Sequence, residues 1–185
     1  METAAWLARV NIRHIMKAEL SALEWEGAYT HYRLVYADAY QRMQNGLTII
    51  WVAYLPGAGV IGQLFVQLIC DRPELADGQS RGYVFAFRVH PAYRSGGLGR
   101  RMLHISENDL IRRGYKTVVL NVAQTNLDAQ RLYQHLGYKI VAPDPGRWSY
   151  PDEKGTWRSE EEPAWRMEKT MDTLPHPIYP EVSRR

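Results

Sequence analysis

The sequence predicts one mixed α/β domain. Between Tyr83 and Val141, apolar strand-like runs alternate with amphipathic helical segments in the order strand, glycine-rich loop, helix, strand, helix, strand. Hydrophobic residues make up 45% of the 185 residues, which is enough for one well-filled core. We therefore place a single domain at residues 1–171. Residues 172–185, which include three prolines, are expected to form a flexible tail.

Residues 1–70 contribute five expected elements. Trp6–Val10 is expected to be a strand, followed by helices over Ile12–Leu23 and Tyr29–Gln44. Leu47–Leu55 and Val60–Cys70 are rich in apolar and β-branched residues and flank a Pro-Gly-Ala-Gly turn, which predicts a hairpin. The second helix carries a narrow stripe of tyrosines. Such a stripe is more often packing than a binding surface.

A glycine-rich loop, Arg94-Ser95-Gly96-Gly97-Leu98-Gly99-Arg100, joins the apolar run Tyr83–Val89 to an amphipathic helix over Leu98–Arg113. Glycines let backbone N–H groups turn inward, and a helix N-terminus adds partial positive charge. The loop is therefore suited to a phosphate or pyrophosphate. A dinucleotide fingerprint would need glycine at Met102, and a Walker loop would need Lys-Ser/Thr after the last glycine, so neither fits. A plain glycine-rich turn remains the structural alternative.

The segment after this helix completes the alternation. Thr117–Val122 is expected to be a buried strand, and Thr125 with Asp128 forms an imperfect capping box for another helix. Gly137 is placed to end that helix, and Tyr138–Val141 to return as a strand. On the helix, one face carries four residues at i, i+3, i+4 and i+7: Ala129, Leu132, Tyr133 and Leu136.

The ordered motifs resemble one family. They are Val89-x-Pro91-x-x-Arg94-x-x-Gly97-x-Gly99, then Leu120-x-Val122, then Asn126-x-x-Ala129-x-x-Leu132-Tyr133-x-x-x-Gly137-Tyr138. In order and spacing they are similar to the GNAT superfamily of acetyl-CoA-dependent N-acetyltransferases. The resemblance implies a GNAT-type acyl-CoA N-acyltransferase fold: a central mixed, mostly antiparallel, twisted sheet flanked by helices, with splayed central strands.

The resemblance also implies residue roles, with acetyl-CoA as cosubstrate. Backbone groups of Phe87 and Val89 would pair with the pantetheine arm as an added strand, and loop amides would hold the pyrophosphate. Asn126 would touch the arm. The full implied cofactor set is Phe87, Arg88, Val89, Arg94, Ser95, Gly96, Gly97, Leu98, Gly99, Arg100, Asn121, Asn126, Ala129 and Tyr133.

Tyr133 is the implied catalytic residue, a general acid for the departing thiolate. Its spacing on the helix alone is equally typical of a core aromatic. A phenol with a pKa near 10 stays protonated at neutral pH and can therefore donate a proton.

No general base is evident. Many family members carry a glutamate on one of the two central strands, but Tyr83–Val89 has no acid and Asn121 stands between Leu120 and Val122. Removing the proton from a lysine-like amine at pH 7 costs about 4–5 kcal/mol, whereas the same step costs about 1–1.5 kcal/mol for an α-amine. The sequence therefore favours a weakly basic acceptor, such as a protein N-terminus, or a water relay.

Acceptor contacts are expected from two regions. The outer tyrosines of the second helix border the acceptor cleft in the resembled family, and the long stretch Ala142–Pro163 is acidic and aromatic, either a solvated loop or a lid over a cationic amine. A closing strand is expected over Ala164–Met171. The candidate substrate residues are Tyr29, Tyr32, Asn121, Asp152 and Glu153.

The function predicted is transfer of acetyl to a primary amine by direct attack, on a small molecule or a protein N-terminus. The alternative is a non-catalytic acyl-CoA-binding sensor module.

A net charge of +3 without a basic–aromatic stripe argues against nucleic-acid binding. The single cysteine and scattered histidines predict no disulfide and no metal, and we expect a cytoplasmic protein without a membrane segment. A homodimer remains open.

Overall fold

A seven-stranded sheet forms the centre of the protein. The computed structural model describes residues 5–171, and the expected tail at residues 172–185 lies outside them. The strand order is β1-β2-β3-β4-β5-β9-β6, with every neighbouring pair antiparallel except the parallel pair β4–β5. The strands are β1 Asn11–His14, β2 Thr48–Leu55, β3 Gly59–Gln67, β4 Arg81–Val89, β5 Thr117–Ala123, β6 Lys139–Asp144 and β9 Ala164–Thr170.

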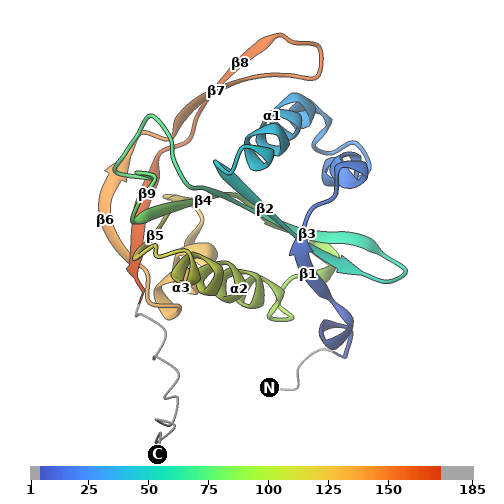
Figure 1. Ribbon diagram of the computed structural model, residues 1–185, viewed down its shortest axis with the longest axis horizontal. Helices are drawn as coiled ribbons and strands as arrows, with labels where there is room; N and C mark the ends of the chain where they lie inside the picture. Colours follow the sequence, from blue (N-terminus) through green and yellow to red (C-terminus); the bar gives the residue numbers. More distant parts are fainter. Residues whose placement is uncertain (1–4, 172–185) are drawn as a thin grey trace, which may run out of the picture.

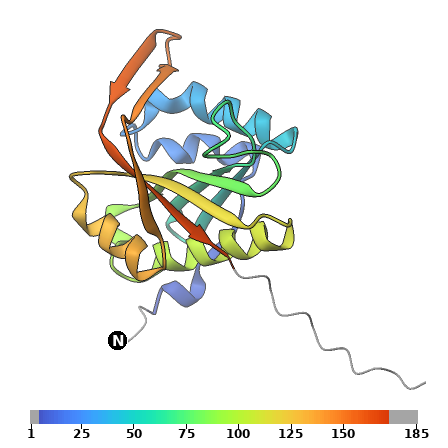
Figure 2. The same cartoon turned by 90° about the vertical axis from the view of Figure 1, so that its left-hand side faces the viewer.

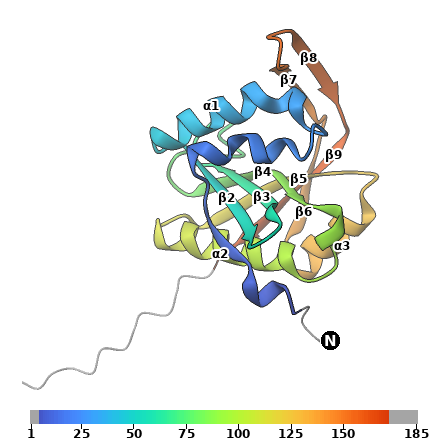
Figure 3. The same cartoon turned by 90° about the vertical axis from the view of Figure 1, so that its right-hand side faces the viewer.

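Helices cover both faces of this sheet. Figures 2 and 3 show α1 (Arg33–Gln44) on one face, and α2 (Leu98–Arg112) with α3 (Leu127–His135) on the other. Each face has its own apolar core. Leu23, Tyr36 and Phe65 are buried on the α1 side, and Met102 and Leu120 on the α2 side. The predicted mixed fold is confirmed, including the mostly antiparallel sheet flanked by helices.

The two central strands separate part of the way along. β4 and β5 pair only from Arg81 with Thr117 to Val84 with Leu120. Beyond Val84, β4 contains a bulge. Gln63 and Phe65 of β3 face Arg88 and Phe85, so the two residues between these on β4 oppose a single β3 residue. The residues Phe85–Val89 and Asn121–Ala123 are thus not joined to each other by the ladder.

The bulge also changes which face of the sheet the side chains of β4 lie on. Phe85 packs with the core on the α1 side, whereas Phe87 and Val89 pack with the core on the α2 side. In a regular strand these three alternate residues would share one face. Ala86 lies at the centre of the bulge with φ of +47°, an unfavourable value for a side chain with a Cβ. The buried side chain of Gln63 donates a hydrogen bond of 3.0 Å to the Ala86 carbonyl and so supports the bulge.

The glycine loop and the elements after it agree with the sequence. α2, β5, α3 and β6 begin and end within three residues of the predicted boundaries. Gly114 and Gly137 follow the two helices with φ of +88° and +91°, as C-terminal glycines do. The predicted cap Thr125 is wrong by one residue. Asn126 is the N-cap, and its Oδ1 accepts a hydrogen bond of 3.1 Å from the Ala129 amide.

Of the five N-terminal predictions, the second helix and the hairpin are confirmed as α1 and β2–β3, but the first two elements are wrong. Trp6–Val10 is not a strand but contains a 3₁₀ turn over Leu7–Arg9, and the helix expected over Ile12–Leu23 is strand β1 followed by a 3₁₀ segment at Lys17–Glu24. Ile12 and Ile15 mislead because a three-residue spacing suits one helix face. In an extended chain the same spacing points the two side chains to opposite faces, and here each packs against a different core.

The region after Val141 is also more ordered than expected. β6 continues to Asp144, and most of the predicted loop over Ala142–Pro163 is a two-stranded hairpin, β7 (Arg147–Pro151) and β8 (Trp157–Glu161). The hairpin projects from the sheet beside the N-terminal end of α1 (Figure 1). Its residues are mostly exposed on both faces, so the sequence has no apolar–polar alternation to reveal it. Within residues 5–171, no helix is long and apolar enough to cross a membrane.

The contact between Gly62 and Met102 fixes how closely α2 approaches the sheet. A Cβ on Gly62 would lie 2.9 Å from Met102 Sδ. Gly62→Ala alone is expected to destabilise by about 1–3 kcal/mol through overpacking, and Met102→Ala alone by about 2–5 kcal/mol through a cavity. The double variant should lose less than the sum, because each change makes room for the other. Urea denaturation of the four proteins measures this, and strict additivity would contradict the contact.

Candidate active site

The glycine loop turns sharply into the start of α2. Ser95 and Gly97 have φ of +62° and +87°, and Gly97 is the N-cap of the helix. The first backbone bond into this helix runs from the Arg101 amide to the Gly97 carbonyl, 3.1 Å. No side chain caps this N-terminus. The amides of Leu98, Gly99 and Arg100 are therefore free to bind an anion, and the helix dipole favours negative charge there.

The N-terminal 3₁₀ turn supports the loop from one side. A Cβ on Gly96 would lie 2.6 Å from Trp6 Cζ2, so Trp6 packs directly on the glycine backbone. The Arg101 guanidinium donates to the Leu7 carbonyl at 2.6 Å, and Arg94 Nε donates to the Val89 carbonyl at 3.0 Å. These two arginines hold the loop in place, and Arg100 is exposed beside them.

The backbone of β4 beyond the bulge faces the gap on the β5 side. The His90 amide donates to the Ile61 carbonyl of β3 at 2.8 Å. Since successive residues of a strand point their backbone groups in opposite directions, Phe87 and Val89 direct theirs away from β3. Gly99 lies against this segment, with its Cβ position 3.3 Å from the Phe87 ring. The loop and the open strand edge therefore form one continuous surface.

Tyr133 lies on α3, which follows β5 directly. Its ring packs edge-to-face on Tyr138, with centroids 5.8 Å apart, and belongs to the core on the α2 side. Burial raises the pKa of its hydroxyl to about 12. Among residues 5–171, no group is hydrogen-bonded to that hydroxyl. The phenol is thus neutral at physiological pH and has its proton available.

Asn121, at the start of the unpaired part of β5, has its Oδ1 buried without a hydrogen-bond partner among the described residues. Near it lies Asp144 of β6, a carboxylate that the sequence did not single out for catalysis. Burial alone would raise the pKa of Asp144, but Arg72 at 2.6 Å, the Gly146 amide and the Asn121 side chain together lower it. A carboxylate already paired with arginine is a weak base.

On the α1 side, Arg88 is bound by tyrosines. Its guanidinium carbon lies 4.1 Å from the centre of the Tyr29 ring and 5.0 Å from that of Tyr32, and Nη1 donates to the Tyr36 hydroxyl at 2.9 Å. The sequence placed Arg88 in the cofactor set and Tyr29 and Tyr32 in the acceptor set. The structure brings the Arg88 side chain to the two tyrosines.

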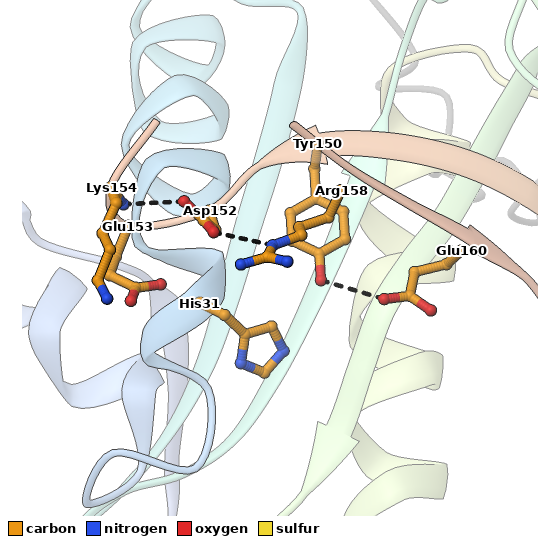
Figure 4. A pocket seen from close by; sticks show the side chains of 7 residues that line it. All are labelled: His31, Tyr150, Asp152, Glu153, Lys154, Arg158 and Glu160. Carbon is orange, nitrogen blue, oxygen red and sulfur yellow. Dashed lines mark hydrogen bonds and ion pairs between the residues drawn. The ribbon is translucent and has the colours of Figure 1, made fainter. Parts of the chain in front are cut away.

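The hairpin and the 3₁₀ turn before α1 (Thr30–Tyr32) border a pocket of about 450 Å³, shown in Figure 4. Its lining residues are His31, Tyr150, Asp152, Glu153, Lys154, Arg158 and Glu160. Asp152 accepts hydrogen bonds from the amides of Lys154 and Thr156, at 3.0 and 2.9 Å, and from Arg158 Nε at 2.9 Å. Its carboxylate therefore stabilises the hairpin turn. The lining holds three carboxylates and two cationic side chains, so its charge is mixed.

The sequence is similar to those of known acetyltransferases. The sequence model of the acetyltransferase (GNAT) family matches residues 14–138. A mycothiol acetyltransferase of Thermobifida fusca (strain YX) is 30% identical over 105 residues, 56% of this chain and 32% of that protein. A [ribosomal protein bS18]-alanine N-acetyltransferase of Haemophilus ducreyi (strain 35000HP / ATCC 700724) is 32% identical over 69 residues, 37% of this chain and 48% of that protein. The matches thus span about a third and about half of these curated relatives.

Solved structures share the whole fold. The ribosomal-protein-S18-alanine N-acetyltransferase from Escherichia coli aligns with a TM-score of 0.65 and 21% identity, over 92% of this chain and 99% of that one. The PaiA N-acetyltransferase from Thermoplasma acidophilum, in complex with coenzyme A, aligns with a TM-score of 0.63 and 17% identity, over 88% and 99% of the two chains. With the family match covering most of its length, the chain belongs to the GNAT family of acetyltransferases.

Proposed function

We propose that this chain transfers an acetyl group from acetyl-CoA to a primary amine by direct nucleophilic attack. The observation that carries the proposal is the open edge of β4, which leads to the uncapped N-terminus of α2. The backbone groups of Phe87 and the Val89 amide are available to pair with the amides of the pantetheine arm, whereas the Val89 carbonyl already accepts a hydrogen bond from Arg94. The amides of Leu98, Gly99 and Arg100 then receive the pyrophosphate.

Tyr133 is suited to stabilise the departing thiolate. A thiol has a pKa of about 8.5, so full transfer of a proton from a phenol of pKa about 12 to the thiolate would cost about 5 kcal/mol in water. In the reaction, the phenol donates a strong hydrogen bond to the sulfur as charge develops. Desolvation of the thiolate beside the half-buried ring raises its basicity and reduces that cost.

The acceptor we propose is an α-amine, as in a protein N-terminus or a small amino-acyl compound. No residue of the β4 or β5 strands is acidic, and Asp144 is paired with Arg72. An α-amine needs only about 1–1.5 kcal/mol to lose its proton at pH 7, so it can attack without an enzyme base. One relative carries a name that fits this proposal, since it is an alanine N-acetyltransferase.

Removing the Tyr133 hydroxyl should slow the chemical step. Tyr133→Phe is expected to lower kcat by about 10²–10³-fold, because the thiolate then leaves without the hydrogen bond from the phenol. The affinity for coenzyme A should change by less than about threefold, since the ring remains in place. Thiol release and calorimetry measure the two quantities. Tyr115→Phe, at the far end of α2, is the matched control, and equal rates for wild type and Tyr133→Phe would contradict the assignment.

The pH dependence of kcat/KM should follow the acceptor amine. With an α-amine probe, the rate should rise with pH up to the pKa of that amine near 8, and a more basic amine should shift the rise upward. Initial rates across pH 5–10 with two amines of different pKa test this. A rise fixed near pH 5 for both amines would reveal an enzyme carboxylate as the base.

The alternative is an acyl-CoA-binding module without catalysis. It is favoured by Asn121, which stands where many relatives carry an acid, and by the engagement of Asp144 with Arg72. Coenzyme A would then bind, but no amine of a broad panel would release thiol from acetyl-CoA. The same assay therefore separates the two functions.

A further inference from the structure

Arg88 is a half-buried cation without an anionic partner among residues 5–171. A half-buried arginine is usually paired with a carboxylate. Glu24, at the end of the 3₁₀ segment before Tyr29, is already bound by other groups. Its carboxylate accepts hydrogen bonds from Arg33 at 2.7 and 2.8 Å and from Thr30 at 2.9 Å. A guanidinium has five N–H donors, and the described contacts of Arg88 use one, to Tyr36.

The remaining donors of Arg88 face accessible space. Buried side-chain nitrogens without partners occur elsewhere in the described chain, but none belongs to Arg88. Arg88 Cζ lies over the Tyr29 and Tyr32 rings, and such contacts hold the cation in place without using its N–H donors. A planar fork of donors in a partly desolvated, aromatic setting is the arrangement that binds a carboxylate with two hydrogen bonds.

The position of Arg88 links it to the reacting centre. It lies between Phe87 and Val89, the two residues whose backbones border the gap, and its side chain points to the α1 face. An acceptor that enters from the α1 face would place its amine at the gap between β4 and β5. Another group of the same acceptor would then lie against Arg88. A polyamine would meet like charge there, whereas an acidic group would be attracted.

We propose that Arg88 binds a carboxylate of the acceptor, so that the substrate is an amine that also carries a carboxylate. This inference rests on the proposed function, because it names the acceptor class of that same site. It makes Arg88 a specificity-determining residue, with Tyr29, Tyr32 and Tyr36 as positioning residues.

The test compares probes that differ only in one charge. The pairs are Ala-Ala and Ala-Ala amide, and Ala-Glu amide and Ala-Gln amide. Wild-type kcat/KM is expected to favour the acid of at least one pair by about tenfold or more. Arg88→Met should reduce that ratio to about one, Arg88→Lys should keep part of it, and Arg112→Met, which removes an exposed charge on α2, should leave it unchanged.

A second measurement does not need turnover. Calorimetry on protein saturated with coenzyme A gives the affinity of each probe, and the acid of a pair should bind about tenfold more tightly in wild type but not in Arg88→Met. A purely structural Arg88 would lower the melting temperature of the variant and leave wild type without an acid preference. Equal binding of acids and amides overturns the inference, as does failure of every probe to bind. Loss of thiol release with intact acid binding would instead overturn the proposed function alone.

Discussion

The end of pairing between β4 and β5 is the constraint on which the site depends. A parallel sheet that continued past Val84 and Leu120 would use the backbone groups of Phe87 and Val89 in the ladder and leave no edge for a ligand. The bulge prevents this, since it bends β4 and turns Phe87 and Val89 toward the α2 core. The Gln63 side chain supports the strained Ala86 by donating a partly buried hydrogen bond to the Ala86 carbonyl.

The two faces of the sheet beside this break carry different chemical groups. On the α2 side, free helix amides and an open strand edge are suited to a long anionic cofactor. On the α1 side, tyrosines surround Arg88 where we propose that the second substrate binds. Tyr133 follows β5 through α3 and brings a neutral phenol to the α2 side of the same region. One local irregularity in β4 therefore separates the two surfaces that we propose for the two substrates.

Sequence reasoning succeeds where structure is local. The glycine loop, α2, β5 and α3 carry strong periodicity and their own termination signals, so their order and boundaries could be predicted. The sequence misses β1 because four residues of edge strand have too short a pattern, and the β7–β8 hairpin because both of its faces are exposed. The environments of Arg88 and Asp144 depend on Tyr36 and Arg72, far away in the chain, so no local pattern reveals them.

Hydrogen exchange of individual amides, measured by NMR with and without coenzyme A, tests the central claim most directly. The amides of Phe87 and Val89 point away from β3 into the gap, whereas that of His90 is already bonded to Ile61. Saturating coenzyme A should slow exchange at Phe87 or Val89 and at Leu98–Arg100, and leave His90 unchanged. Bound coenzyme A that leaves the β4 amides as fast as before would contradict the account, because the cofactor would then lie elsewhere.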